Sequence, residues 1–461
     1  MFLETMFERF CEVSPVTVMV RATLEHALAP AWIDALFEHT AKGQYTRTLT
    51  LSTLVDLMAP VVCGTHPSVH SAFQKSKAQI GASITAVYDK LKRLETNVSE
   101  ALARESAARM AAVIDAMPGG CREALVRGYR TRILDGNCLG ATEHRLFELR
   151  DIAAGPLPGK SLVVLDPQRM LLLDLFACED GHAQERSLLD RVLATIEARQ
   201  LWIADRNFCT AAFLRGIDRR NGCFVIRHHK GLVFEDCGPW KEAGMTDTGH
   251  VMERTVKFVD DQGQWFTVRL VRVRLDKKTR DGDEYLLLLT NLPLKAADAK
   301  TIAEAYRNRW LLETAFLHLT ETLRCEVNTL GYPKAALFAF AVAVLTYNVL
   351  AVQRAALRSE HGQQKGDDEL SMYHLTDDIV GTYRGMEIAL PEPVWVKYRD
   401  YTAPLLAAEL RRLARAVDLR RYRKAVRGPK KPQPPRLKAK DKPHVSTKRL
   451  LDARKSKKTT P

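Results

Sequence analysis

Three acidic residues that lie far apart in the chain could together support metal-dependent chemistry on phosphates. Asp135 and Asp205 each follow a short apolar run and precede polar residues, and Glu313 lies within a helical pattern. Mg²⁺ prefers oxygen ligands, and two divalent cations about 3.5–4 Å apart can hold the attacking and leaving oxygens of a phosphoryl displacement. An aspartate after a strand is more often a turn former, so this prediction depends on the three carboxylates acting together.

The helical pattern around Glu313 adds further polar side chains. Tyr306, Arg309, Glu313 and Thr320 follow one another at spacings of three, four and seven residues, which places them on one helical face. Arg309 could bind a phosphate through two hydrogen bonds, and Tyr306 could contact a DNA backbone. The alternative is a surface ion pair between Arg309 and Glu313, worth about 0.3–0.5 kcal/mol, with Tyr306 as a core residue. Without the two aspartates, we would prefer that alternative.

The chain resembles the transposases of the insertion-sequence-four family, which are DDE enzymes of bacterial mobile elements. The catalytic helix of that family carries the pattern Y-x2-R-x3-E-x6-K. Tyr306, Arg309 and Glu313 match its first three positions, and Thr320 stands where the family has lysine. The resemblance extends to ILDGN and IADRNF, which contain the two aspartates, and to the LLLLTN run before the catalytic helix. It spans roughly residues 60–355.

This resemblance implies an α/β fold, a ribonuclease H-like mixed sheet with an all-β insertion between the second and third acids. It implies that Asp135, Asp205 and Glu313 are the catalytic metal ligands for two Mg²⁺ ions, for which Mn²⁺ would substitute, and that Tyr306 and Arg309 position the phosphate. It also implies the reaction. Water first cleaves a phosphodiester at the end of the element, and the released 3′-hydroxyl then attacks a second strand.

Some members of the family pass through a DNA hairpin and hold a flipped base on an aromatic side chain of the β insertion. Tyr285 is our first candidate for that side chain and Trp265 the second. The alternative is ordinary packing, because half-buried aromatics in a sheet usually pack against neighbours.

The implied partners are double-stranded DNA at the terminal inverted repeats of the element, target DNA, and a second copy of the chain in a homodimeric synapse. The implied location is the bacterial cytoplasm, at the nucleoid. Two alternatives stay open. One is a ribonuclease H-like nuclease that cuts without strand transfer. The other is a catalytically inactive DNA-binding relative, for which Thr320 is the sequence hint.

Apolar runs of strand length begin after residue 127 and could position the aspartates. They predict three strands, a helix and a fourth, buried strand in a mixed α/β core, at Tyr129–Leu134, Ser161–Leu165, Met170–Phe176, Ala183–Arg199 and Leu201–Ala204. Alternation from Cys223 to Asn291 then predicts an inserted subdomain of antiparallel strands at about residues 222–291.

Two helices are predicted after the insertion. Lys300–Glu326 reads as one long helix that carries Glu313. The run Ala335–Val352 approaches the length of a membrane span, but it contains polar residues and stands alone. We therefore expect a buried core helix and no membrane partner.

The N-terminal region, residues 1–127, shows helical periodicity without strand signals. Within it, Ser71–Leu94 predicts a short helix, a turn at Gly81, Ser83 as N-cap and a second helix. In a helix-turn-helix the second helix enters the major groove, so four of its residues would face DNA: Thr85, Lys90, Lys92 and Arg93. An ordinary helical hairpin is an equally open interpretation, and the DNA-end-binding role of residues 1–127 depends on the first.

The basic residues of the chain are concentrated at its C-terminal end. The 461 residues carry a formal net charge of +14, and from Arg420 onward there are 17 Lys and Arg but only 2 Asp. We divide the remainder into a catalytic region at 128–355, a C-terminal helical region at 356–427 with a basic helix at Ala403–Arg427, and a tail at 428–461. The tail is rich in lysine and proline, so we expect disorder and salt-sensitive phosphate contacts.

Several other classes of protein are not indicated. The nine cysteines are scattered and include no CxxC pair, which predicts free thiols in a reducing compartment. The N-terminus lacks the pattern of a secretory signal. No histidine pair has a third ligand at zinc spacing, and no phosphate-binding glycine loop is present.

Overall fold

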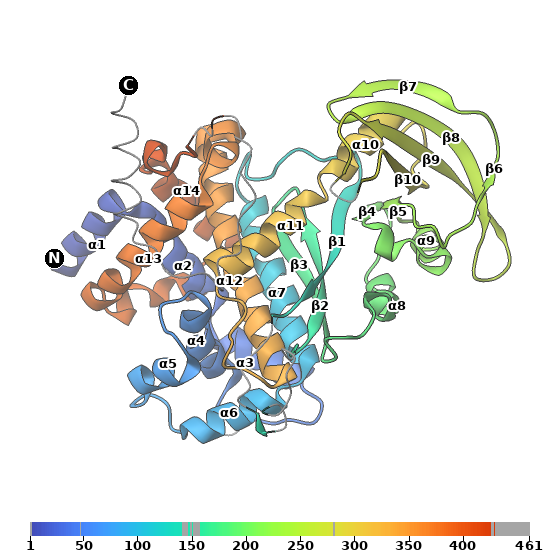
Figure 1. The fold of residues 1–461 in the computed structure, drawn as a ribbon. Helices are drawn as coiled ribbons and strands as arrows, with labels where there is room; N and C mark the ends of the chain where they lie inside the picture. The colour runs from blue at the N-terminus through green and yellow to red at the C-terminus, as the bar shows by residue number, and fades with distance from the viewer. Residues whose placement is uncertain are drawn as a thin grey trace, which may run out of the picture. The chain divides into compact units, whose positions relative to one another are not determined.

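A mixed β-sheet positions the acidic residues, and helices from both ends of the chain pack beside it (Figure 1). The computed structural model describes residues 2–46, 48–140, 146–147, 150, 157–279, 282–425 and 428. The predicted disordered tail, apart from Gly428, lies outside the described residues.

Ten strands in the described ranges form one continuous sheet, in the order β3-β2-β1-β4-β5-β10-β9-β8-β6, with β7 paired to β8. The first three strands are antiparallel, whereas β4 is parallel to both β1 and β5. The expected mixed α/β fold and the buried position of the fourth strand are therefore confirmed. The strands are β1 Arg130–Cys138, β2 Lys160–Asp166, β3 Leu171–Cys178, β4 Gln200–Ala204, β5 Cys223–Arg227, β6 Glu235–Asp236, β7 Lys241–Thr246, β8 Gly249–Val259, β9 Trp265–Leu275 and β10 Tyr285–Thr290.

The strands predicted as an insertion do not form a separate sheet. β5 pairs with β4 in parallel, β10 pairs with β5, and β9 and β8 continue outward from β10. An inserted sheet and an extension of the core sheet have the same period of two residues, so alternation alone could not separate them. The long β8–β9 pair thus extends the sheet that carries the aspartates.

The N-terminal region is helical, and the described residues before Arg130 contain no strand, as expected. Ser83 Oγ accepts a hydrogen bond from the backbone N–H of Ala86 at 3.2 Å, so the predicted N-cap is confirmed. The helices are α1 Phe2–Val13, α2 Pro15–Ala27, α3 Pro30–Thr40, α4 Leu51–Val62, α5 Val69–Ser76, α6 Ile84–Arg93 and α7 Thr96–Asp115.

The long apolar helix α12, Pro333–Gln363, is a core helix. The segment Pro333–Asp368 is the one helix in the described ranges that is long and apolar enough to span a membrane, and its most apolar window is wholly buried. α12 packs against α2, α4, α7 and β3, and it lies among the helices in Figure 1. Its buried Asn348 exchanges two 2.8 Å hydrogen bonds with the backbone of Leu172 in β3, which satisfies this polar side chain inside the protein.

Three predicted helices are shorter or broken in the structure. Ala183–Arg199 forms a 3₁₀ turn η2, Glu185–Leu188, and a short helix α8, Leu189–Leu193. Lys300–Glu326 and Ala403–Arg427 are also interrupted, because apolar periodicity detects a buried face but not the turns that redirect it. Their helical parts are α10 Ala299–Arg307, α11 Trp310–Leu317, the π turn η4 His318–Thr322 and α14 Ala403–Arg415. One further helix, α9 Ala211–Asp218, was not predicted, whereas α13 Met372–Ala389 lies in the predicted C-terminal helical region.

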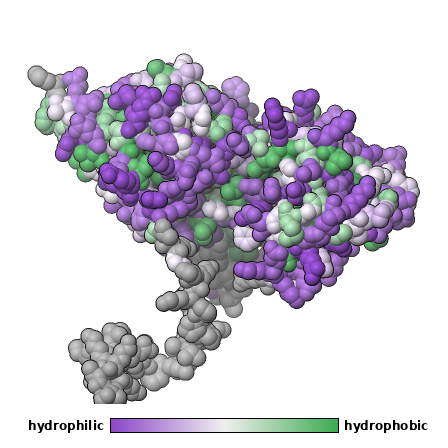
Figure 2. Space-filling view, turned by 90° about the horizontal axis from the view of Figure 1, so that it is seen from above, coloured by the Kyte–Doolittle hydropathy of each residue, from purple (hydrophilic) through white to green (hydrophobic). Residues whose placement is uncertain are grey.

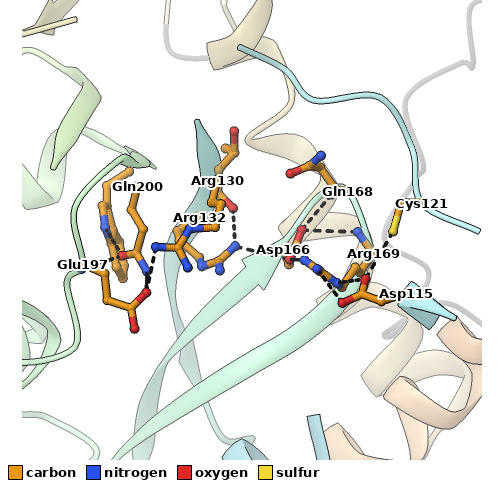
Figure 3. A network of polar contacts seen from close by, with 11 residues as sticks. Asp115, Cys121, Arg130, Arg132, Asp166, Gln168, Arg169, Glu197 and Gln200 are labelled. Atoms are coloured by element: carbon orange, nitrogen blue, oxygen red, sulfur yellow. Dashed lines mark hydrogen bonds and ion pairs between the residues drawn. The ribbon is translucent and has the colours of Figure 1, made fainter. Parts of the chain in front are cut away.

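A buried acid at the end of β2 shows what a structural carboxylate looks like in this sheet (Figure 3). Asp166 lies between Arg132 and Arg169, at 3.3 and 2.8 Å, and accepts the backbone N–H of Gln168. Arg169 in turn bonds Asp115 at the end of α7 at 2.8 Å. The side chain of Asp166 is 1% exposed, so this acid joins α7 to the sheet and is closed to ligands.

The surface in Figure 2 is mainly hydrophilic, with scattered apolar residues. All nine cysteines lie in the described ranges and none forms a disulfide, as expected for free thiols.

Candidate active site

The pairing of β1 with β4 brings Asp135 and Asp205 to neighbouring positions. The parallel register joins Leu134 to Ala204, so the next residue on each chain is an aspartate. Asp205 follows the end of β4 and precedes the 3₁₀ turn η3, Arg206–Phe208, as expected. The expectation that β1 ends at Asp135 is wrong, because β1 stays paired with β2 as far as Cys138.

The third acid, Glu313, lies in the second of two consecutive helices that are joined by a 3₁₀ turn. The backbone N–H groups of Arg309 and Leu312 donate to the carbonyls three residues earlier, at 2.9 and 3.1 Å, a 3₁₀ pattern that separates α10 from α11. Tyr306 therefore lies in α10 and Glu313 in α11, with Arg309 at the junction.

Arg309 and Tyr306 connect the three acids. Arg309 Nη1 lies 3.0 Å from Asp135 Oδ2, and Arg309 Nη2 lies 2.7 Å from Glu313 Oε1. Tyr306 Oη donates to Asp205 Oδ1 at 3.3 Å. We call these five residues the acid centre. The Arg309 side chain is only 13% exposed and contacts two carboxylates, so the alternative of a simple surface ion pair does not describe it.

Burial and charge shape the titration of the acid centre. Burial raises the pKa of Asp135 to about 6, the neighbouring Asp205 and Glu185 add to this rise, and Arg309 and the Gly136 N–H oppose it. Burial lowers the pKa of Arg309, but Tyr306 and the surrounding carboxylates together raise it by more. The net shift of this pKa is therefore upward. Burial, with the charge of Asp205, also raises the pKa of Tyr306. The ionised form of Asp135 is therefore disfavoured until more positive charge is nearby.

The donor set of the acid centre suits a hard cation, although the residues are not arranged as a ready metal site. Among the described residues, no group of three or more His, Cys, Asp or Glu side chains is placed to hold a metal ion. The guanidinium of Arg309 lies between Asp135 and Glu313 instead. All three acids offer carboxylate oxygens, and the disfavoured charge of Asp135 beside Asp205 is the kind of repulsion that a divalent cation relieves.

Two residues next to the acid centre were not identified from the sequence. Glu185 of η2 accepts a hydrogen bond from Asn207 Nδ2 at 2.5 Å and lies against Gly136. The pattern of Ala183–Arg199 predicted only a helix with an apolar face, and no local signal in it singles out Glu185.

Thr320 does not contact the acid centre. It is exposed, and its hydroxyl donates to the carbonyls of Phe316 and Leu317 at 2.9 and 3.2 Å. The helical phase that placed it with Glu313 changes at η4.

The predicted DNA-facing residues of α6 have different surroundings. Thr85, Lys92 and Arg93 are exposed, whereas Lys90 is half-buried. Lys90 Nζ lies 4.4 Å from the ring centre of Phe37 and donates to the Tyr45 carbonyl at 3.3 Å. Lys92 Nζ lies 4.4 Å from the ring centre of Tyr332.

The candidate aromatics Tyr285 and Trp265 lie on opposite faces of the sheet. Tyr285 pairs with Arg274 near the end of β9, and Trp265 begins the same strand nine residues earlier. Paired residues share a face and an odd separation along a strand changes it. Tyr285 is 44% exposed and Trp265 52%.

Arginines surround the Tyr285 side of the sheet. The Arg272 guanidinium lies 5.5 Å from the ring centre of Tyr285 and 4.1 Å from that of Trp240. Arg254 approaches the Trp240 ring to 4.3 Å. Among the described contacts, the Trp265 ring has one cationic neighbour, Lys257, whose Nζ lies 4.2 Å from the ring centre.

The acid centre lies in a part of the chain that matches a known family model. Residues 127–349 match a family described as "Transposase DDE domain", and this segment contains the whole acid centre. No curated protein matches the chain. Among solved structures, the chain is similar to the piggyBac transposase in a synaptic complex with hairpin DNA, determined by cryo-electron microscopy, at 9% identity over 85% of each chain and a TM-score of 0.39.

Proposed function

We propose that this protein is a DDE transposase that cleaves the DNA ends of its own mobile element and joins them to target DNA. The observation that carries the proposal is the position of Arg309, which contacts Asp135 and Glu313, beside the Tyr306–Asp205 hydrogen bond. All these residues lie within the segment that matches the transposase family.

In this proposal Asp135, Asp205 and Glu313 hold two Mg²⁺ ions, and Mn²⁺ substitutes for them. When bound, these ions would stabilise the charge on the attacking and leaving oxygens at phosphorus. Tyr306 orients the Asp205 carboxylate. Arg309 is planar, with donors on two edges, so it can hold a carboxylate on one edge and a phosphate oxygen of the scissile bond on the other.

The DNA partners are the terminal inverted repeats and the target duplex. We assign repeat binding to the N-terminal helices, with Thr85, Lys90, Lys92 and Arg93 of α6 near the DNA, and strand contacts to Tyr285. Trp265, on the other face, is the weaker candidate. We expect a homodimer, because two ends must be cut in one synapse, and a cytoplasmic location at the bacterial nucleoid.

The test is a cleavage and joining assay with the purified full chain, Mg²⁺ and duplexes that carry the flanking ends of the element. Wild-type protein should give nicked ends and joined products. Asp205→Asn should abolish both and keep DNA binding in a gel-shift assay. Asp190→Asn, at an exposed site of α8, is the matched control and should retain activity.

The other functional classes give different products. Cleavage without joints would identify a nuclease, and binding without cleavage by wild-type protein would identify an inactive relative. Unchanged cleavage by Asp205→Asn would refute the assignment of the acid centre.

A further inference from the structure

We propose that Glu185 is a positioning residue of the acid centre, which holds the strand segment after Asp135 and the turn after Asp205 at a fixed spacing. This inference rests on the proposed function for its activity measurements. Glu185 lies in η2, between β3 and β4 in sequence, and its two carboxylate oxygens face two different segments.

The first segment is the 3₁₀ turn η3 that follows Asp205. Asn207 Nδ2 donates to Glu185 Oε2 at 2.5 Å, and the neighbouring Arg186 Nε donates to the Asn207 carbonyl at 2.6 Å. The dipeptide Glu185–Arg186 therefore binds Asn207 through both its side chain and its backbone. The Asp205 side chain makes no capping bond to its own turn, so the contacts with Glu185 and Arg186 add to the backbone hydrogen bond from Phe208 N–H to the Asp205 carbonyl at 3.0 Å.

The second segment is the part of β1 that follows Asp135. A Cβ atom at Gly136 would lie 2.0 Å from Glu185 Oε1, so the carboxylate occupies the space that any other residue would fill. The Gly136 N–H donates to Asp135 Oδ1 at 2.9 Å. Glu185 thus packs on the same peptide unit that holds the Asp135 carboxylate.

Glu185 therefore links these two segments directly, in addition to the contacts that Arg309 and Tyr306 make with the aspartates themselves. The β1–β4 ladder fixes the register only as far as Leu134 and Ala204, one residue short of each acid. Beyond that point Glu185 is the side chain that contacts both segments, among the hydrogen bonds and close approaches of the described residues. Residues that orient metal ligands from outside typically change metal affinity or activity by about 10- to 100-fold when removed.

The first test separates the hydrogen bond from the charge. Glu185→Ala should lower the cleavage rate by about tenfold or more and reduce the rise in melting temperature that Mg²⁺ produces. Glu185→Gln can still accept from Asn207, so it should stay within about twofold of wild type in both measurements. A loss with Glu185→Gln as large as that with Glu185→Ala would overturn the positioning role, since only the charge would then matter.

The second test exchanges donor and acceptor. Asn207→Asp places two carboxylates together and should lower cleavage by about tenfold. Combining it with Glu185→Gln recreates one donor and one acceptor, and should restore the rate to within about twofold of wild type. Failure of the double variant to recover would refute a direct Glu185–Asn207 contact.

The third test uses Gly136, where the three atoms nearest to an added Cβ all belong to the carboxylate end of Glu185. Gly136→Ala should impair wild-type protein about as much as Glu185→Ala, and should add nothing in the Glu185→Ala background, because space is then available. Additive losses would contradict the contact. Asp190→Ala removes an exposed carboxylate from the adjacent α8 and serves as the matched control, with no expected change.

Failure of this inference can be told apart from failure of the proposed function. If wild-type protein does not cleave DNA, the transposase assignment fails. The coupling of Glu185 to Asn207 and Gly136 is still measured by the Mg²⁺-induced change in melting temperature. If wild-type protein cleaves and all Glu185 variants behave like it, only the positioning role is refuted.

Discussion

Asp135 and Arg309 form a 3.0 Å ion pair although 174 residues separate them in sequence. The pair joins the centre of β1 to the junction of α10 and α11. It therefore fixes the helix that carries Glu313 against the strand that carries the first acid. A guanidinium can do this for two carboxylates together because its donors lie on different edges of a plane.

Replacing Arg309 should therefore affect activity far more than replacing its exposed neighbour. We expect Arg309→Ala to lower cleavage by about a hundredfold, the order seen when one donor to a reacting phosphate or oxyanion is removed. Arg309→Lys keeps the charge but not the planar pair of donors, so it should recover only part of the rate. Arg307→Ala, at the end of α10 and with a side chain that is 58% exposed, should cleave normally. Equal effects at the two positions would contradict the role of Arg309.

The raised pKa of Asp135 predicts a pH dependence of stability in metal-free protein. Burial first of all raises this pKa from 3.8 to about 6, so the protonated form is favoured in the folded state. Its contribution to the free energy of unfolding is complete below about pH 3.8 and is lost as the pH rises through about 6. Asp135→Asn should remove this part of the slope. Urea unfolding in EDTA between pH 4 and 7 measures it, and parallel curves for the two proteins would contradict it.

Metal binding should have the opposite pH dependence and strengthen as the pH rises, because a bound cation requires the ionised carboxylate. The rise in melting temperature on adding Mg²⁺ should be small at about pH 5 and large at about pH 8. Asp135→Asn should abolish the rise at both values.

The two aromatics on the extended strands should behave differently. Tyr285 lies with Arg272 and Trp240 on one face, and Trp265 lies on the other. We expect Tyr285→Ala to weaken binding of a duplex with an unpaired base near the cleavage site by about 1–3 kcal/mol, the usual loss of a base-stacking contact. Trp265→Ala is the matched control and should bind normally. Fluorescence anisotropy measures both, and a larger effect of Trp265 would reverse the assignment.

We expect Arg93 of α6 to contact DNA and Lys90 of the same helix to stabilise the fold. Arg93 is exposed, so Arg93→Ala should weaken binding to the repeat and reduce its salt dependence by about one counterion. Lys90 packs on Phe37 and bonds the Tyr45 carbonyl. Lys90→Ala should therefore lower the melting temperature more than the affinity. Identical salt slopes for Arg93→Ala and wild type would indicate that α6 does not touch DNA.

Sequence alone predicted the local parts of the acid centre and missed those that depend on distant partners. Asp205 at the end of β4 and the Tyr306, Arg309 and Glu313 spacing were readable because each is encoded within a few residues. The continuation of β1 past Asp135 was not, since it comes from pairing with β2. Glu185 was not either, because its contact with Asn207 spans 22 residues.

The same difference between local patterns and long-range contacts explains which parts of the fold could be predicted. The places of the first four strands along the chain and the buried state of α12 followed from apolar runs, which report burial directly. The breaks at Asn308 and after Leu188 lie inside continuous apolar patterns, where only the tertiary packing decides how the backbone turns. Thr320 is an example, because the helical face predicted to carry it together with Glu313 is interrupted before it by the π turn η4.

The position of α12 has a consequence for biosynthesis. It covers the apolar faces of α2, α4 and α7, yet it begins only at Pro333. The N-terminal helices also contact one another, but the apolar faces that α12 covers stay exposed, and prone to aggregation, until much later residues are translated. A stop codon anywhere before α12 should yield insoluble fragments rather than a separately folded DNA-binding piece.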